Sequence, residues 1–167
     1  MNILLTCAGR RNYIVDYFRE ALAGTDGKIY AANSTPDSTA LISADKGFVV
    51  PTVYDPGYID ALIRICRSCG IQAIIPLFDM ELPVLADAAQ RFLLSGVYPI
   101  VSSSKVISIC NDKWRTSEFL VQNDVSTPRS FLNLDEALIA LETGEISYPL
   151  IIKPRWGMGS IGEVPKA

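Results

Sequence analysis

The chain has 167 residues, a net charge of −3 and no histidine, and its composition (49% hydrophobic, 20% charged) is typical of a globular domain and excludes a disordered chain. Lysine and arginine are neither in excess nor clustered, which argues against a nucleic-acid interface, and no apolar run is long enough to span a membrane. The first residues place apolar side chains before the arginines, the reverse of a secretory signal, so we expect a cytoplasmic protein.

The first part of the chain alternates short apolar runs with helical patterns. The predicted strands span residues 2–7, 27–34, 46–51, 71–78 and 97–103. The predicted helices span residues 10–22, 55–70 and 79–96, and residues 35–44 form a connection with at most one helical turn. Asp55 is the expected cap of the second helix and Gly70 its end. Because strands that alternate with helices pair in parallel, we predict an α/β domain over residues 1–101, with an open, mostly parallel sheet and flanking helices.

The pattern changes after residue 101. Residues 102–125 are helical but broken near Asn111-Asp112, and we assign them to a helical linker. The elements predicted after them are an extended run over 125–134, a helix over 135–146, a strand over 148–154, a loop over 155–162 and a tail over 163–167. This set indicates an incomplete α+β subdomain over residues 126–167.

The loop after the last strand contains Gly157, Gly159 and Gly162 at the spacing G-x-G-x-x-G. A dinucleotide-binding fingerprint also needs a helix after its glycines, and the five residues that follow, with Pro165 among them, cannot form one. A Walker A loop would need Gly-Lys-Ser or Gly-Lys-Thr at its end, which the sequence lacks. Two interpretations stay open: a hairpin turn that uses glycine, or a mobile loop whose backbone N–H groups approach phosphate oxygens beside Lys153.

Several segments resemble the ATP-grasp superfamily. "PLIIKPRWGMGSIG" is similar to its phosphate-loop strand, and "NDKWRTSEFLVQNDVSTPRS" is similar to the segment that opens the ATP-grasp region, where a lysine starts a helix. "IIPLFDMELPVLAD" and "TCAGRRNYIVDYF" resemble proteins like the large subunit of carbamoyl phosphate synthase. The resemblance covers essentially the whole chain. It implies a Rossmann-like pre-ATP-grasp domain, followed by the start of the ATP-grasp small domain.

The resemblance also implies a reaction, that of an ATP-dependent carboxylate–amine ligase. In such ligases ATP phosphorylates a carboxylate, and an amine attacks the resulting acyl phosphate. The residues that the resemblance places at the ATP phosphates are Lys113, Lys153, Gly157, Met158, Gly159, Ser160 and Gly162. It implies Mg²⁺ as well, with ligands in a part of the fold that follows the glycine loop, so we predict neither a metal ligand nor a catalytic residue in this chain.

Polar residues follow the predicted strands at their carboxyl ends, where parallel α/β sheets bind ligands. Arg10 and Arg11 follow the first strand and could hold an acidic substrate by bidentate contact, and Asn33 ends the second strand. Asp79 and Glu81 follow the fourth strand, and Glu81 either orients an amine or simply favours a helix N-terminus. We predict that the two arginines and the two acidic residues bind a small-molecule carboxylate substrate.

We interpret the chain as the N-terminal part of a longer ligase, inactive alone, because the fold implied by the resemblance continues beyond Ala167. Two alternatives stay open: a non-catalytic α/β module that binds a metabolite or nucleotide, and a docking subunit of a split ligase. A half-built subdomain should expose its apolar faces, so we also predict a homodimer formed through residues 127–167.

Overall fold

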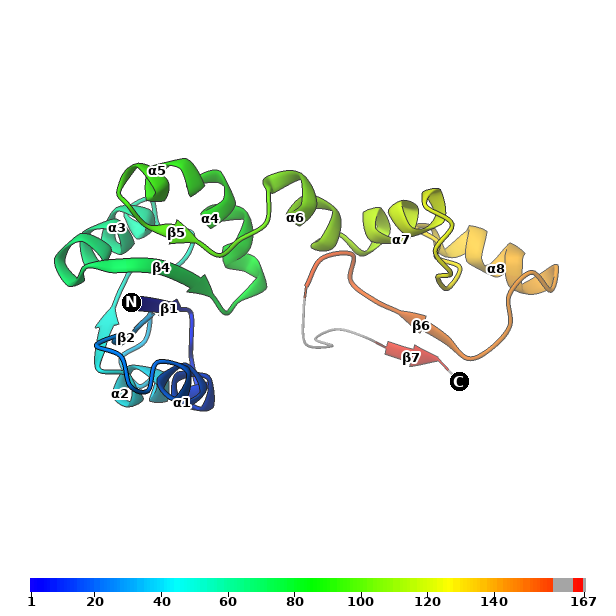
Figure 1. Ribbon diagram of the computed structural model, residues 1–167. Coiled ribbons are helices and arrows are strands. Elements are labelled where there is room, and N and C mark those ends of the chain that lie inside the picture. The colour runs from blue at the N-terminus through cyan, green and yellow to red at the C-terminus, as the bar shows by residue number, and fades with distance from the viewer. Residues whose placement is uncertain (158–163, 167) are drawn as a thin grey trace. The chain divides into compact units, whose positions relative to one another are not determined.

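The computed structural model describes residues 1–157 and 164–166. The chain divides into two compact units, Met1–Ser104 and Lys105–Ala167, which are coloured blue to green and green to red in Figure 1. Among the described residues, all buried hydrophobic side chains except Ile107 and Ala140 belong to the first unit. The first unit therefore holds the main hydrophobic core of the chain.

The first unit is built on a five-stranded parallel sheet (Figure 1). Its strands are β1 (Asn2–Thr6), β2 (Ile29–Asn33), β3 (Lys46–Val49), β4 (Ile71–Pro76) and β5 (Tyr98–Pro99). They lie in the order β3-β2-β1-β4-β5, and every neighbouring pair is parallel. The first strand, β1, is at the centre of the sheet, with β2 on one side of it and β4 on the other. This architecture confirms the predicted open α/β sheet.

Helices cover both faces of this sheet. They are α1 (Asn12–Ala21), α2 (Thr39–Ser43), α3 (Tyr58–Cys69), the 3₁₀ helix η1 (Asp79–Glu81), α4 (Leu82–Asp87) and α5 (Ala89–Leu94). Because side chains alternate along a strand, Leu4 and Leu5 of β1 enter different core clusters. Leu4 packs with buried side chains of α3, α4 and α5, and Leu5 packs with those of α1 and α2. Every residue of β1 except the first is buried, as expected for a strand covered on both sides.

Two local predictions for these helices were wrong. The helix expected over residues 79–96 consists of three pieces, because Ala88 (φ −91°, ψ 0°) leaves helical geometry between α4 and α5. Asp55 does not cap α3: Gly57 is the N-cap residue, and the Asp55 carboxylate accepts from the Gly57 N–H at 2.7 Å in the turn before it. Gly70 does end the helix, in the left-handed conformation (φ 59°) that glycine adopts readily.

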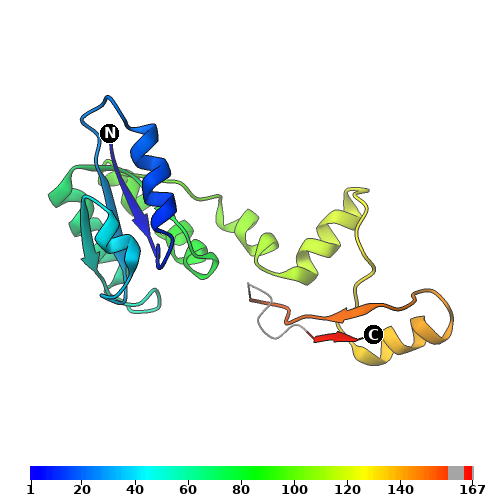
Figure 2. The ribbon, with the colours of Figure 1, turned by 90° about the horizontal axis from the view of Figure 1, so that it is seen from below.

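The second unit is smaller and mixed. Its elements are α7 (Lys113–Gln122), α8 (Leu134–Glu142), β6 (Leu150–Ile152) and β7 (Val164–Lys166), preceded by α6 (Ser104–Cys110), which starts at the last residue of the first unit. The predicted break near Asn111-Asp112 is present, since Asp112 is extended and begins a new helix. The interpretation of residues 163–167 as a tail was wrong for 164–166, because β7 pairs antiparallel with β6 (Figure 2).

The second unit leaves large apolar side chains in solvent. On α8 only Ala140 is buried, whereas Leu134 and Ile139 are 57% and 59% exposed. Ile151 and Ile152 of β6 are 59% and 44% exposed. Apolar surface of this kind is the usual sign of an interface with further protein.

Candidate functional site

The first candidate region is the carboxyl edge of the parallel sheet, where the loops after β1, β2 and β4 begin. Gly9, in the loop after β1, has a positive φ of 55°, which glycine tolerates. Its N–H donates to the Asn33 side-chain oxygen at 3.3 Å, and the Ser38 hydroxyl donates to its carbonyl at 2.5 Å. These two hydrogen bonds connect the loop after β1 to the end of β2 and to the start of α2.

The predicted substrate residues take different positions at this edge. Arg10 is exposed, while Arg11 is the N-cap residue of α1 and its guanidinium donates weakly, at 3.5 Å, to the Cys7 carbonyl. Asp79 is exposed at the start of η1. Glu81, at the end of η1, is fully buried. Three of the four predicted side chains can therefore meet a solute directly, and Glu81 is enclosed by protein.

Glu81 belongs to a buried polar cluster with Tyr58 and Cys7. The Tyr58 hydroxyl donates to Glu81 Oε1 at 2.6 Å, and the Cys7 thiol lies 3.6 Å from the same hydroxyl. Glu81 Oε2 has no hydrogen-bond partner among the described residues. Cys7 also has a positive φ of 50°, a conformation that costs energy for a residue with a side chain. The cluster joins the end of β1, the start of α3 and η1.

Burial controls the protonation of this cluster. It raises the pKa of the Glu81 carboxyl, while the hydrogen bond from the Tyr58 hydroxyl opposes the rise. Burial and, next, the Glu81 charge raise the pKa of the Cys7 thiol to about 12, and the same two causes raise the pKa of Tyr58. A thiol with so high a pKa stays protonated at neutral pH, so Cys7 is not an activated nucleophile.

Sequence reasoning did not find Cys7 or Tyr58. Cys7 is the last residue of the first predicted strand and directly follows β1 in the structure, so its position at a strand end was a usable signal. Tyr58 gives no such signal, because it lies 51 residues from Cys7 and 23 from Glu81 in the sequence. Only the packing of α3 on the sheet brings the three side chains together.

The second candidate region lies in the second unit, where Lys113 meets the start of the glycine loop. Lys113 is the first residue of α7, and its ammonium donates to the carbonyls of Pro154 and Gly157, each at 3.0 Å. Its backbone N–H donates to the Arg155 carbonyl at 3.2 Å. Lys153 is exposed and directly follows β6. The structure therefore brings together Lys113 and the Lys153–Gly157 segment.

The remaining predicted loop residues, Met158, Gly159, Ser160 and Gly162, lie outside the described part of the chain. Gly157 is described and has φ 127°, in the region that residues with side chains rarely adopt. A glycine at this position allows the backbone conformation that presents its own carbonyl to the Lys113 ammonium.

Asp112, which sequence reasoning did not single out, connects the same two segments. It is buried, caps α7 by accepting from the backbone N–H groups of Trp114 and Arg115, and pairs with the Arg155 guanidinium. Hydrogen bonds from Arg155 are the largest cause that lowers the pKa of Asp112 to about 2, and the pair in turn raises the pKa of Arg155. The position of Asp112 just before a helix was the one signal for it in the sequence.

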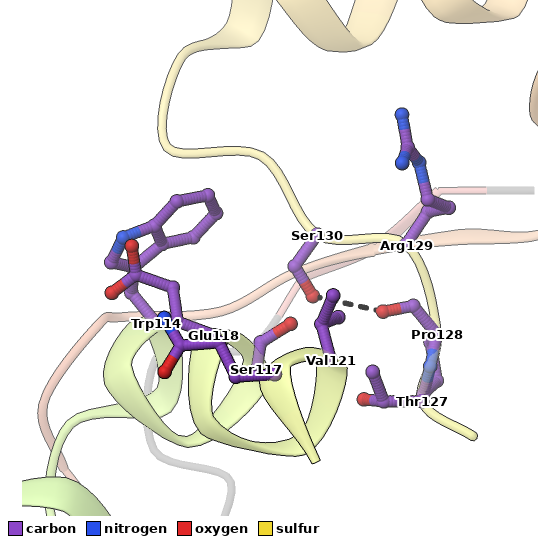
Figure 3. A pocket seen from close by; sticks show the side chains of 9 residues that line it. Trp114, Ser117, Glu118, Val121, Thr127, Pro128, Arg129 and Ser130 are labelled. Carbon is purple, nitrogen blue, oxygen red and sulfur yellow. Dashed lines mark hydrogen bonds between the residues drawn. The ribbon is translucent and has the colours of Figure 1, made fainter. Parts of the chain in front are cut away.

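A shallow pocket of about 250 Å³ lies beside α7 (Figure 3). Trp114, Ser117 and Val121 line it from the helix, and the Thr127–Ser130 segment lines it from the other side, where the Ser130 hydroxyl donates to the Pro128 carbonyl at 3.2 Å. None of the predicted site residues lines this pocket. It is therefore distinct from the region around the Lys113 ammonium.

Two general features complete the description. Within residues 1–157 and 164–166, no three Cys, Asp or Glu side chains gather closely enough to hold a metal ion. Within the same residues, no helix has both the length and the apolar character needed to cross a bilayer.

The fold and the two regions together define a class of protein. A Rossmann-like parallel sheet, followed by a helix that begins with a lysine and by a strand that leads through a second lysine into a glycine loop, is the arrangement of the pre-ATP-grasp domain and the start of the ATP-grasp domain. Residues 3–100 match the family described as "PylC-like, N-terminal domain", and the chain belongs to this family. This result confirms the resemblance that the sequence indicated.

The chain is also similar in sequence to two known proteins and in fold to a third. The chain is 27% identical over 139 residues to the carbamoyl phosphate synthase large chain of Campylobacter jejuni, a match that covers 81% of the chain and 12% of that protein. It is 29% identical over 70 residues to the alpha-aminoadipate–LysW ligase LysX of Saccharolobus solfataricus, which covers 40% of the chain and 26% of that protein. The ADP complex of purK, an N5-carboxyaminoimidazole ribonucleotide synthetase, has a similar fold (TM-score 0.67, 19% identity, 99% of this chain and 40% of that chain).

Proposed function

We propose that this chain supplies the N-terminal part of an ATP-dependent carboxylate–amine ligase. The observation that carries the proposal is the contact of the Lys113 ammonium with the Pro154 and Gly157 carbonyls, which brings a cation to the base of the glycine loop. The names of two relatives, a synthase and a ligase, and the bound ADP in a protein of the same fold support it. Since the chain spans only 12% to 40% of these proteins, the reaction belongs to the proposal.

In this proposal the ATP phosphates lie against Lys113, Lys153 and the loop residues Gly157, Met158, Gly159, Ser160 and Gly162. The two ammonium groups offset the phosphate charge, and the glycines of the loop let backbone N–H groups approach the phosphate oxygens. The γ-phosphoryl group passes to a substrate carboxylate, an amine attacks the acyl phosphate, and inorganic phosphate leaves. Mg²⁺, when bound, would neutralise further phosphate charge, and none of the described residues form a site for it.

The substrate carboxylate is assigned to the carboxyl edge of the first unit's sheet. Arg10 and Arg11 supply positive charge there, and exposed Asp79 can accept from an amine. Because Glu81 is buried, we assign it to positioning: its hydrogen bond with Tyr58 holds the end of η1, the short helix that begins with Asp79, against α3. The chemical class of the substrate is thus an acid whose binding depends on arginine.

An isotope experiment tests the proposed reaction. The protein encoded by the whole reading frame that contains these residues is incubated with ATP, an amine and a carboxylate labelled with ¹⁸O. If an acyl phosphate forms, the phosphate that leaves carries one carboxylate oxygen, and mass spectrometry of the phosphate detects the label. ATP binding without transfer of the label would instead identify a non-catalytic binding module, and label that appears only after a second protein is added would identify a docking subunit.

We also propose that the chain forms a homodimer through the exposed apolar side chains of α8 and β6. Burial of such side chains against a second copy is favourable at about 25 cal/mol per Å² of apolar surface. Light scattering of the 167-residue chain is expected to give twice the monomer mass, and Ile139→Lys with Ile151→Lys should return it to the monomer mass. A monomer at every concentration would contradict the dimer.

A further inference from the structure

We propose that Asp112 and Arg155 are positioning residues. Their ion pair holds the Pro154–Gly157 segment, where the glycine loop begins, against the first turn of α7 and so fixes the position of the Lys113 ammonium. This inference rests on the proposed function for its consequence in ATP binding. The contact itself does not depend on any nucleotide, and it can be tested in the isolated chain.

The ion pair between Arg155 and Asp112 is bidentate. Arg155 Nε donates to both oxygens of the Asp112 carboxylate, at 2.8 and 3.0 Å, and Arg155 Nη2 donates to Oδ2 at 2.7 Å. Asp112 is only 4% exposed. A planar guanidinium that meets a carboxylate through two of its nitrogens restricts both distance and orientation, which a lysine at the same place could not do. The pair therefore fixes residue 155 relative to residue 112, although 43 positions separate them in the sequence.

The same carboxylate also fixes the helix. Asp112 Oδ1 accepts from the Trp114 N–H at 3.0 Å and from the Arg115 N–H at 3.3 Å, which satisfies two donors of the first turn of α7. One side chain thus joins the N-terminus of the helix and the segment after β6. Any movement of that segment away from α7 must break charged hydrogen bonds to a buried carboxylate.

Lys113 directly follows Asp112, the residue that caps α7 and pairs with Arg155. Its ammonium has three donors, and two of them are used by the Pro154 and Gly157 carbonyls. The third donor has no partner among residues 1–157 and 164–166, and in the proposed function it is directed to a phosphate oxygen. Because the carbonyls that hold the ammonium lie on both sides of Arg155 in the sequence, loss of the ion pair would release the Pro154–Gly157 segment and with it both partners of Lys113.

Arg115 is a suitable control residue, because it is a second arginine close to the Asp112 carboxylate. Its guanidinium lies 3.7 Å from the Asp112 carboxylate, but the side chain is 56% exposed and is on the helix itself, so it cannot attach the loop. Low pH cannot replace mutation as a test, because the pKa of Asp112 is lowered to about 2 and the pair stays ionised over the range in which proteins are handled. Substitution of the two residues is therefore required.

The test uses Asp112→Asn, Arg155→Gln, their double variant and the control Arg115→Gln. Asparagine caps helices about as well as aspartate, so Asp112→Asn removes the charge of the pair while it keeps the cap of α7. Circular dichroism checks that helix content is unchanged. Without nucleotide, chymotrypsin is used to cut after Trp156, an exposed residue next to Arg155, and mass spectrometry follows the fragment that begins at Gly157.

We expect Asp112→Asn and Arg155→Gln each to speed this cleavage at least fivefold, with the double variant no faster than the faster single variant. Arg155→Lys should rescue part of the effect, and Arg115→Gln should stay within twofold of the natural protein. Equal cleavage of all variants, or single effects that multiply in the double variant, would overturn the proposal.

ATP affinity of the whole gene product then separates this inference from the proposed function. If the natural protein binds ATP, both single variants should bind it at least fivefold more weakly, and unchanged affinity would overturn the positioning role. If the natural protein binds no ATP, the proposed function fails, while the cleavage rates still decide whether the ion pair holds the loop.

Discussion

Replacement of Lys113 by methionine is expected to weaken ATP binding at least tenfold. Methionine keeps much of the length of the side chain but loses the charge and the contacts to the Pro154 and Gly157 carbonyls. A hydrogen bond to a charged group contributes about 1.5–3 kcal/mol, and each 1.4 kcal/mol corresponds to about tenfold in affinity. Lys153→Met, which removes the second proposed phosphate contact, is expected to have an effect of similar size. Isothermal titration of the whole gene product with MgATP measures both.

Lys105→Met is the matched control for this prediction, since Lys105 is an exposed lysine of α6 in the same unit. Its ATP affinity should equal that of the natural protein. If Lys113→Met and Lys105→Met bound ATP equally well, the phosphate site would have to be placed elsewhere. Lys113→Arg adds a further distinction: it keeps the charge, so it should retain more affinity than methionine if phosphate charge is what Lys113 recognises.

Replacement of Glu81 by glutamine is expected to change the pH dependence of folding. The pKa of Glu81 is raised in the folded protein by burial, so above the ordinary glutamate pKa the folded state keeps a proton that the unfolded state has lost. Since the folded state then binds more protons, its stability falls as pH rises, and the loss grows until the folded pKa is passed. Glutamine does not titrate, so the free energy of unfolding of Glu81→Gln should fall less between pH 4 and pH 8.

The free energy of unfolding of the natural protein should therefore have the steeper dependence on pH over this range. Tyr58→Phe should lower the free energy of unfolding at neutral pH by about 2 kcal/mol, because it removes the hydroxyl that donates to Glu81 Oε1. Urea unfolding at several pH values measures both variants. Glu20→Gln, at an exposed position of α1, is the control, and an identical pH slope for Glu81→Gln and Glu20→Gln would contradict the prediction.

Most of the fold could be predicted from local patterns. Apolar runs bounded by glycine and polar residues located all five parallel strands. The pattern is clearest for β1 and β2, which are buried along most of their length and are therefore apolar at nearly every position. The break between α6 and α7 followed from Asn111-Asp112, where a side chain can cap a new helix. Local patterns failed at Ala88, where no breaker residue marks the interruption, and at β7, which is a strand because it pairs with β6.

For the candidate site, too, some features could be predicted from the sequence and others could not. By itself the sequence determined the alternation that builds the sheet and the order of Lys113, Lys153 and the glycines, because helix and strand periods and turn chemistry act over a few neighbouring residues. Only the tertiary structure decided that Glu81 is buried under Tyr58 and that Asp112 meets Arg155. Those contacts join segments 23 and 43 residues apart, and no short-range rule relates such distant positions until the chain has packed.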